Sequence, residues 1–320
     1  MNSPLNSPGS TKTRTPMVFV TGVDEIFFNQ IFLLLGSLQR SSPGIFLYVC
    51  DFGLSERQRE FLRQKRMLLE VPAGIGNRRR VWEYKAGLVR YVADLHAECV
   101  VWLDADLIAL SDIAALMGEL NARMQQDIHT VAAPSVGTIE EQLAVGLWTN
   151  APHYARLVAE CGPDIAYLSS GIFLCRSAEL LSRWEQITLM MPLELLYEQN
   201  AFNLAARESA QSIRLMEPLI WNPSGQDMHL VTAERSGPSL AVSGPKGKCH
   251  ILHVTSTNRA RDLVLFGLTF RFDGNEYSPQ IRMMRYPEVV FEYQQEIIKE
   301  AIVADFRLLA ACGLCSPSKV

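Results

Sequence analysis

CVVWLDADLIAL, residues 99–110, is an apolar run of strand length that is interrupted by two aspartates. Two further apolar runs lie upstream, MVFV at 17–20 and GIFLYVCD at 44–51. Strands that alternate with helices of about 10–15 residues indicate crossover connections and a parallel sheet. Each run is apolar on both faces, as expected when helices cover both sides of a sheet. The sequence therefore predicts an α/β fold.

The spacing of apolar residues elsewhere continues this alternation of elements. Residues 222–250 differ from the rest because they are rich in Gly, Pro and Ser. The patterns predict helices at 25–40, 55–65, 82–95, 112–124, 138–147, 177–190, 193–208 and 287–311, and strands at 68–71, 171–175 and 250–254.

Composition shifts divide the chain into three parts. Residues 1–16 are rich in Ser, Pro, Thr and Asn, and we expect them to be a disordered lead-in. Residues 17–285 are expected to form the main domain, and residues 286–320 a C-terminal amphipathic helix and tail. The apolar stripe of that helix predicts packing on the domain, and it is also compatible with a homodimer.

The 320 residues are 48% hydrophobic and 20% charged, which is typical of a globular protein. A net charge of −4 argues against nucleic acid or an anionic membrane as the main partner. No uncharged apolar run approaches the ~18 residues of a membrane span, and the N-terminal residues lack the apolar region of a secretory signal. Most of the seven cysteines lie in apolar runs, which favours reduced thiols and a cytoplasmic protein.

Asp104 and Asp106 follow what should be a central, buried strand. Two carboxylates at a core boundary cost several kcal/mol unless something pairs with them. Helix capping is the simplest alternative, but the next helix has its own natural cap in Ser111. On an extended segment, residues two apart turn their side chains to the same side. Paired carboxylates at the ligand-binding edge of a parallel sheet suit Mg²⁺ or Mn²⁺ together with phosphate oxygens.

VWLDADLIAL resembles the metal-binding D-x-D segment of GT-A-fold glycosyltransferases, which use nucleotide-diphosphate sugars. Other segments, in the same order along residues 17–260, resemble parts of the retaining glycosyltransferase family 8. These segments are VFVTGVDEIFFNQIFLLLGSLQ, LYVCDFGLSERQ, YKAGLVRYV, YLSSGIFLCR, YEQNAFNL and ILHVTS. The resemblance implies a GT-A fold, in which a mixed and mainly parallel sheet is flanked by helices, for residues 17–285.

The resemblance also implies a metal site. Asp104 and Asp106 would bind the cation, and His253 would be the third protein ligand. A histidine nitrogen beside two carboxylates favours Mn²⁺ over Mg²⁺. His250 is the rival of His253, and because strand positions three apart face opposite ways, at most one of them should face the site.

The donor site follows from the same resemblance. Lys85 would approach the diphosphate or the sugar, although a lysine on a helix surface would give the same sequence. The residues implied to contact the nucleotide part of the donor are Thr21, Gly22, Asp24, Asp51 and Ala105, several of which could equally be solvated turn residues.

Ser169, Ser170 and Gly171 would line the sugar, and Glu198 and Gln199 would hold its hydroxyls near the anomeric carbon. Members of this family retain the anomeric configuration. A covalent nucleophile would have to be a carboxylate, and Glu198 is the candidate in that segment. A front-face mechanism, in which the departing diphosphate takes the acceptor proton, is equally compatible.

Three positions depart from the family pattern. The family has Asn at the position of Ser169 and Asp at that of Glu198. It also has H-x-x-G-x-x-K-P-W after the metal histidine, where this chain has Arg259 in place of the lysine and no Pro-Trp. Arg259 is a bidentate donor and could hold the diphosphate.

These observations predict a metal-dependent transferase that moves a hexose from a UDP-sugar to a glycan, lipid or protein acceptor. A sugar-phosphate nucleotidyltransferase is a second class, but it should have a glycine- and lysine-rich loop after the first strand, and VTGVDE has no basic residue. A catalytically silent relative that binds sugars or nucleotides is a third class.

Overall fold

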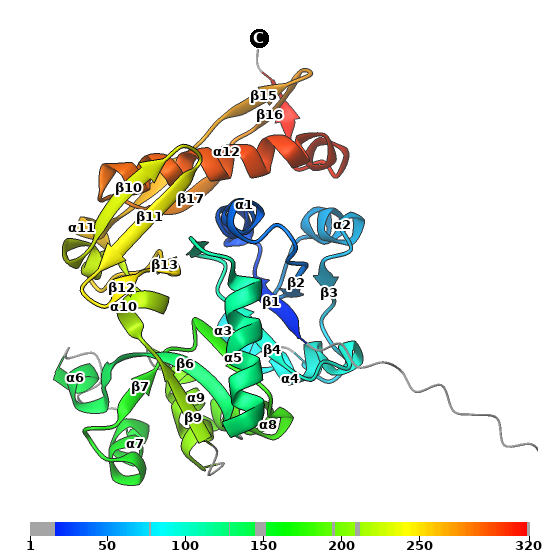
Figure 1. The fold of residues 1–320 in the computed structure, drawn as a ribbon. Helices are drawn as coiled ribbons and strands as arrows, with labels where there is room; N and C mark the ends of the chain where they lie inside the picture. Colours follow the sequence, from blue (N-terminus) through cyan, green and yellow to red (C-terminus); the bar gives the residue numbers. More distant parts are fainter. Residues whose placement is uncertain are drawn as a thin grey trace, which may run out of the picture.

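The computed structural model describes residues 17–76, 78–127, 129–144, 152–193, 196–208 and 212–318, so the predicted lead-in at 1–16 lies outside the described residues. An eight-stranded sheet has the order β3-β2-β1-β4-β8-β6-β7, with β9 beside β6 (Figure 1). Strands β3, β2, β1 and β4 are parallel neighbours, and β8 is antiparallel to β4 and β6. The predicted mixed α/β sheet is confirmed. The strands are β1 (Val18–Val23), β2 (Leu47–Asp51), β3 (Leu68–Leu69), β4 (Val100–Leu103), β6 (His129–Thr138), β7 (Ala166–Leu168), β8 (Ile172–Cys175) and β9 (Ser212–Met216).

Both faces of this sheet are buried. Along β1, Val18 and Val20 belong to one hydrophobic cluster, whereas Phe19 and Val23 belong to another on the opposite face. Successive side chains of a strand point to opposite faces, so a strand between two layers of helices needs apolar residues at every position. This requirement explains the continuous apolar run that predicted the strand.

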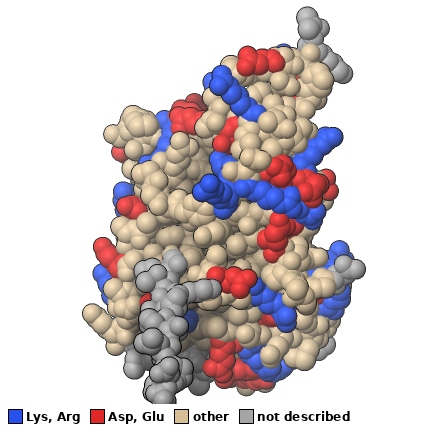
Figure 2. Space-filling model, turned by 90° about the vertical axis from the view of Figure 1, so that its right-hand side faces the viewer, with Lys and Arg blue, Asp and Glu red and all other residues tan. Residues whose placement is uncertain are grey.

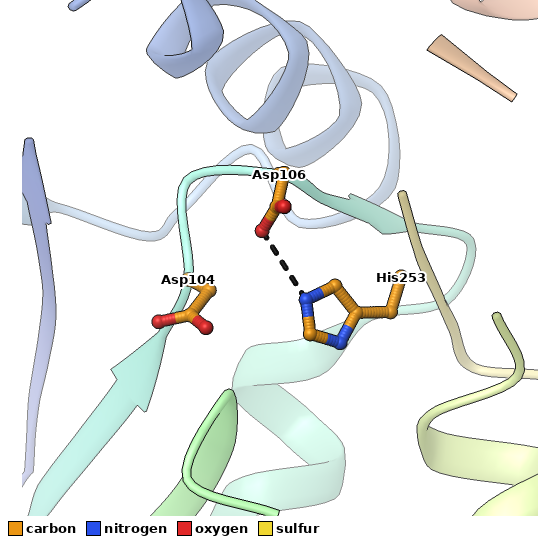
Figure 3. A group of neighbouring side chains, drawn as sticks. All are labelled: Asp104, Asp106 and His253. Atoms are coloured by element: carbon orange, nitrogen blue, oxygen red, sulfur yellow. Dashed lines mark ion pairs between the residues drawn. The ribbon is translucent and has the colours of Figure 1, made fainter. Parts of the chain in front are cut away.

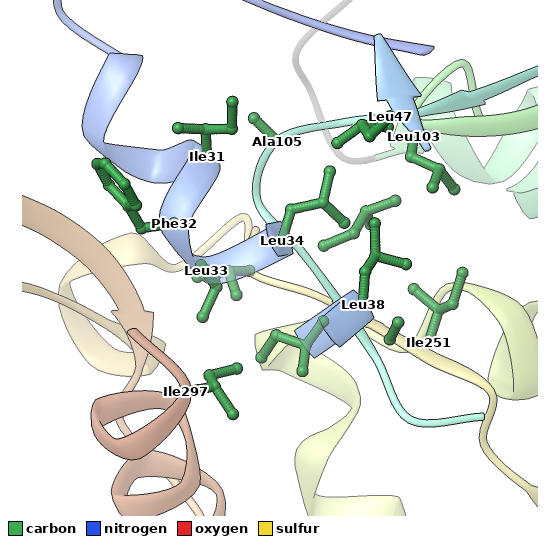
Figure 4. Packing of buried hydrophobic residues seen from close by; sticks show 14 of the residues in the cluster. Ile31, Phe32, Leu33, Leu34, Leu38, Leu47, Leu103, Ala105, Ile251 and Ile297 are labelled. Atoms are coloured by element: carbon green, nitrogen blue, oxygen red, sulfur yellow. The ribbon is translucent and has the colours of Figure 1, made fainter. Parts of the chain in front are cut away.

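Helices α1 (Ile31–Ser41) and α12 (Glu288–Ala311) cover one face of the sheet, and they pack against each other (Figure 4). A Cβ at Gly36 would lie 2.2 Å from the carbonyl oxygen of Ile297, so the absence of a side chain permits the close approach of the two helices. The apolar stripe of α12, which includes Ile298 and Ile302, is buried in this core. The expected packing of the C-terminal helix on the domain is confirmed.

Helices α3 (Val81–Ala86), α4 (Leu88–Tyr91), α8 (Ala178–Met190) and α9 (Tyr197–Glu208) pack on the other face. The single helix predicted at 82–95 is wrong, because the chain leaves helical geometry at Gly87 and ends this region in a short 3-10 turn, Ala93–Leu95. The start of α8 is stabilised by Ser177, whose hydroxyl accepts a hydrogen bond from the Leu180 N–H.

Of the remaining helices, α2, α5 and α6 largely agree with predicted ranges, whereas α7, α10 and α11 were not predicted. The start of α5 depends on Asp112, whose carboxylate accepts from the Ala115 N–H at 3.2 Å, so the expectation that Ser111 caps this helix is wrong. The bounds are α2 (Glu56–Gln64), α5 (Ile113–Asp127), α6 (Ile139–Ala144), α7 (Pro152–Cys161), α10 (Pro218–Trp221) and α11 (Arg259–Asp262), with 3-10 turns at Phe28–Gln30 and Gly225–Leu230. The positions predicted to be helical at 145–147 and 194–195 lie outside the described residues.

Four small antiparallel units, most of which the sequence patterns did not predict, complete the fold. The hairpin β15–β16 lies on the side of α12 that faces away from the central sheet (Figure 1). These units contain β5 (Leu107–Ala109) with β13 (Ile251–His253), β10 (Thr232–Ser236) with β11 (Ser239–Gly244) and β12 (Gly247–Lys248), β14 (Leu263–Gly267) with β17 (Gln280–Met284), and β15 (Phe270–Phe272) with β16 (Asn275–Tyr277) and β18 (Ser316–Pro317).

The face of the molecule that carries α2 has interspersed basic and acidic side chains (Figure 2). Arg63 pairs there with Glu56 at 2.5 Å and with Glu70 at 2.8 Å. Exposed pairs of this kind contribute little to stability. In the described part of the chain, no helix has the length and apolar character that crossing a membrane requires.

Candidate functional site

The two aspartates lie at the carboxyl end of β4, at the edge where ligands of parallel sheets bind. Asp104, Ala105 and Asp106 form a turn, in which the Leu107 N–H donates to the Asp104 carbonyl at 3.2 Å. The prediction that both aspartates lie on an extended segment is therefore wrong. The turn still brings their carboxylates to one side, with Ala105 buried between them.

His253 completes the cluster from a distant part of the chain. Strand β13 pairs antiparallel with β5, and this register places His253 opposite Leu107. One ligand atom each from Asp104, Asp106 and His253 lies within 4.8 Å of the others (Figure 3). Two carboxylates and one imidazole are a donor set that fits Mn²⁺ or Mg²⁺.

The histidine ring is fixed by its other nitrogen. Nδ1 of His253 lies 2.9 Å from Oδ1 of Asn222, which can only accept, so Nδ1 carries a proton. Nε2 lies 3.2 Å from the Asp106 carboxylate. Burial lowers the pKa of His253, but Asp106 more than offsets this effect and the net shift is upward. His250 points elsewhere, with Nδ1 3.1 Å from the Ser111 hydroxyl.

Lys85 lies beside the other aspartate. Its ammonium group is 2.9 Å from Oδ1 of Asp104, which also accepts from the Trp102 indole N–H at 2.6 Å. The lysine is buried, so the alternative of a lysine on a helix surface is wrong. Burial lowers the pKa of Lys85, but the charges of Asp104 and Glu198 outweigh burial and raise it. The site therefore holds a permanent cation next to a candidate metal ligand.

Gly171 lies against the cluster of Asp104, Asp106 and His253, because it precedes β8, the antiparallel neighbour of β4. The Asp104 N–H donates to the Gly171 carbonyl at 2.8 Å. A Cβ on Gly171 would lie 2.7 Å from His253 Cε1 and 3.0 Å from Asp104 Oδ2. Ser169 accepts the Gly171 N–H at 3.2 Å, so the loop of Ser169, Ser170 and Gly171 forms one wall of the site.

Glu198 and Gln199 approach the same loop from α9. The hydroxyl of Ser170 lies 3.3 Å from Glu198 Oε2, and the backbone N–H of Ser170 donates to Gln199 Oε1 at 3.1 Å. Glu198 is buried, and its Oε1 has no hydrogen-bond partner among the described residues. Burial raises the pKa of Glu198 to about 7, against the lowering effect of Lys85. A buried, unpaired carboxylate oxygen indicates a place for a ligand hydroxyl or proton.

Thr21 and Gly22 lie near the carboxyl end of β1. Thr21 is fully buried, and its hydroxyl has no partner among the described residues. A Cβ on Gly22 would lie 2.2 Å from the Phe52 ring, so glycine leaves room for this ring to lie on the strand. Phe52 stacks in turn on Tyr84 and on Trp102, with centroids 6.0 and 6.1 Å apart.

A hollow of about 340 Å³ adjoins these rings. Asp24 lines it, and its carboxylate accepts the Phe27 N–H at 2.7 Å. Asp51 does not line it: its carboxylate is buried and accepts from the backbone of Gly53 and Leu54 and from Arg59. The other residues that line the hollow are Glu25, Ile26, Phe52, Gly53, Arg78, Arg79, Arg80, Val81 and Tyr84.

Sequence reasoning missed three residues of the site, namely Trp102, Asn222 and Arg282. Trp102 lies two residues before Asp104, on the same side of the strand, and that spacing could have indicated it. Arg282 lies on β17, with Nη1 4.0 Å from Asp106 Oδ2. Neither Asn222 nor Arg282 belongs to a motif, so no local signal could have found them. Arg259, which was predicted, is an exposed residue of α11.

No protein-family model and no curated protein sequence matches the chain. Its similar solved structures include the bifunctional glycosyltransferase WbbM, at 11% identity and a TM-score of 0.48, over 80% of this chain and 48% of that one. They also include the galactosyltransferase LgtC in complex with donor and acceptor sugar analogues, at 13% identity and a TM-score of 0.47, over 75% and 88% of the two chains. The apo form of the glycosyltransferase GlyE from Streptococcus pneumoniae TIGR4 is 15% identical, with a TM-score of 0.48, over 96% of this chain and 66% of that one.

This chain thus spans about half the length of the WbbM structure. The three similar structures are glycosyltransferases.

Proposed function

We propose that this protein is a metal-dependent glycosyltransferase that transfers a hexose from a UDP-sugar to an acceptor, with retention of configuration. The observation that carries the proposal is the cluster of Asp104, Asp106 and His253, within 4.8 Å of one another at the carboxyl edge of the parallel strands. Lys85 and the buried Glu198 lie next to it. A site with metal ligands, a fixed cation and a protonatable carboxylate suits the departure of a diphosphate from a sugar.

The donor set favours Mn²⁺, because a histidine nitrogen accompanies the two carboxylates. A bound divalent cation would neutralise the diphosphate and stabilise the charge that develops on it. In the chain itself, Asn222 holds the imidazole so that Nε2 faces the cluster. The Lys85 ammonium offers the diphosphate a second positive charge.

The hollow beside Phe52 and Tyr84 suits the nucleoside, because aromatic rings stack with a base and Asp24 accepts hydrogen bonds from base or ribose. Gly22 lies against Phe52, which lines this hollow, and Thr21 precedes it in β1. Asp51 already has its carboxylate occupied, so we assign it a supporting role in the turn after β2.

The sugar would then lie against the loop of Ser169 to Gly171, with Gln199 and Glu198 below it. Two retaining routes fit. In one, Glu198 attacks the anomeric carbon and the diphosphate leaves with the electron pair of its bond to that carbon. The acceptor oxygen then displaces the Glu198 carboxylate, and the departed diphosphate takes the acceptor proton. In the other, the acceptor oxygen attacks on the face that the diphosphate leaves, and the diphosphate takes the acceptor proton.

A panel of UDP- and GDP-sugars with Mn²⁺, scored for slow hydrolysis without acceptor, tests the proposal. We expect one or a few UDP-sugars to be cleaved, and proton NMR of the released sugar should show the donor's anomeric configuration first. Folded protein that binds but does not cleave any donor would favour a silent binding protein. The acceptor, a glycan, lipid or protein, can then be sought with the identified donor.

All seven cysteines are free in the structure, which supports the proposal that the protein works in a reducing compartment such as the cytoplasm.

A further inference from the structure

Arg282 is a charged residue at the site that the proposed function leaves without a role. Its Nη1 lies 4.0 Å from Oδ2 of Asp106, which is too long for a direct hydrogen bond. Its side chain is 24% exposed, and its guanidinium lies over the Phe27 ring, 5.1 Å from the centroid. The group is therefore close to the cluster of Asp104, Asp106 and His253 and partly shielded from water, and its ion pair with Asp106 is a long one.

The position of Arg282 is fixed by a buried side chain from the other end of the chain. The Gln30 amide accepts from the Arg282 N–H at 3.0 Å and donates to the Arg282 carbonyl at 2.9 Å. Gln30 belongs to the 3-10 turn that follows β1. This pair of hydrogen bonds ties β17 to the edge of the sheet where the donor is proposed to bind.

The charges around Arg282 do not cancel. Burial lowers the pKa of the Arg282 guanidinium, Asp106 raises it, and the like charge of Arg259 lowers it again. A divalent cation on Asp104 and Asp106 would neutralise both carboxylates. Lys85, Arg259 and Arg282 would then remain as positive charges near the cluster, with Glu198 as the neighbouring carboxylate, and this excess of positive charge suits a bound diphosphate.

We propose that Arg282, together with Arg259, binds the diphosphate of the donor and stabilises it as it leaves. The inference rests on the proposed function, and it adds to the donor site a residue that lies outside the D-x-D, serine and histidine segments. When the bond between the anomeric carbon and the diphosphate oxygen breaks, its electron pair stays on that oxygen and the diphosphate gains a negative charge. A fixed guanidinium stabilises this product more than the intact donor, which is the differential binding that catalysis requires.

The test compares nucleotides that differ by one phosphate. UDP, GDP, ADP and CDP are each titrated beside their monophosphates in the presence of Mn²⁺, with wild-type protein, Arg282→Ala and Arg282→Lys. Arg285→Ala is the matched control, because Arg285 is an exposed arginine three residues further along the same segment. Thermal unfolding of each variant checks that it is folded.

We expect Arg282→Ala to weaken binding of the preferred diphosphate by about 10- to 100-fold, the usual effect of losing a charge-assisted contact, and to change binding of the monophosphate by less than about threefold. Arg282→Lys should recover part of the loss, and Arg285→Ala should behave as wild type. Equal losses for diphosphate and monophosphate, or none, would overturn the inference. Wild-type protein that binds no diphosphate would instead contradict the proposed function.

Discussion

The imidazole of His253 and the side-chain amide of Asn222 are joined by a hydrogen bond of 2.9 Å, and this bond decides which ring nitrogen faces the aspartates. Because Asn222 Oδ1 accepts from Nδ1, the lone pair of Nε2 is directed at the cluster when the ring is neutral. A partner of this kind orients a metal ligand and is itself part of the metal site.

Replacement of Asn222 by alanine should therefore weaken Mn²⁺ binding by about 10- to 100-fold without removing a ligand. Titration of Mn²⁺ followed by electron paramagnetic resonance measures the effect. Asn29→Ala is the control, because it removes another side-chain hydrogen bond, from the Tyr277 hydroxyl at 2.5 Å, at a position that supplies no metal ligand. Equal Mn²⁺ affinity in Asn222→Ala and wild type would show that the asparagine does not orient the ring.

Asp106→Asn should abolish turnover, with a loss of about 100-fold or more in kcat, while the protein stays folded. A neutral amide is a poor ligand for a hard cation and also loses the ion pair with His253. Donor hydrolysis is measured beside circular dichroism. Asp305→Asn, which removes a carboxylate paired with Lys65 at 2.5 Å on another face, should keep its activity. Turnover of Asp106→Asn at the parent rate would rule out the metal role.

Gly171→Ala should block the site, because the added Cβ would lie 2.7 Å from His253 and 3.0 Å from the Asp104 carboxylate. We expect Mn²⁺-dependent binding of UDP to fall by at least about tenfold, since the histidine and the aspartate must move apart. Gly118→Ala in α5 is the control: nothing lies within 4 Å of its Cβ, and alanine should stabilise the helix by about 0.5–1 kcal/mol. If Gly171→Ala binds UDP normally, the proposed position of the diphosphate is wrong.

The pKa of Glu198, raised by burial to about 7, makes stability depend on pH. The folded protein binds a proton at Glu198 more tightly than the unfolded chain, in which a glutamate titrates near about 4.3. The stabilising contribution is therefore complete below about pH 4 and is lost as the pH rises through about 7.

Glu198→Gln removes this loss. Between pH 5 and pH 8, in the presence of a chelator, the free energy of unfolding of wild type should therefore fall by up to about 3 kcal/mol more than that of Glu198→Gln. Urea unfolding at both pH values measures this difference between the two proteins. The contributions of all other titratable groups are the same in both and cancel. Glu119→Gln, on the exposed face of α5, should follow the wild-type curve. Parallel curves for wild type and Glu198→Gln would show that the carboxylate does not titrate in this range.

Local patterns predicted the centre of the fold because burial on both faces leaves a direct trace in the sequence. The run that became β1 had to be apolar at Val18, Phe19 and Val20 alike, and no loop or half-exposed strand requires that. The antiparallel units between residues 222 and 318 left a weaker trace. Strand β10 in one of these units alternates between exposed and half-buried positions, and a short strand of this kind has a sequence similar to that of turns and loops.

The site could be predicted where its residues stand together in the chain, as Asp104 and Asp106 do. Residues brought in by long-range pairing could be named only through the family resemblance, as His253 was, or not at all. Arg282 stands in a strand whose neighbours Ile281 and Met283 are buried, so the alternation indicates an ordinary solvent-facing arginine. Its place near the aspartates depends on long-range packing, in which the side chain of Gln30, 252 positions away in the sequence, bonds the Arg282 backbone.

The contact between Gly36 and Ile297 has a consequence for how the molecule is made. The first long helix packs against residues that leave the ribosome some 260 positions later. Its apolar face must stay shielded by other means during synthesis, because its permanent partner does not yet exist. We therefore expect nascent chains that stop before residue 288 to bind chaperones, and the edge of the sheet that carries the candidate site to take its final shape only after translation has passed α12.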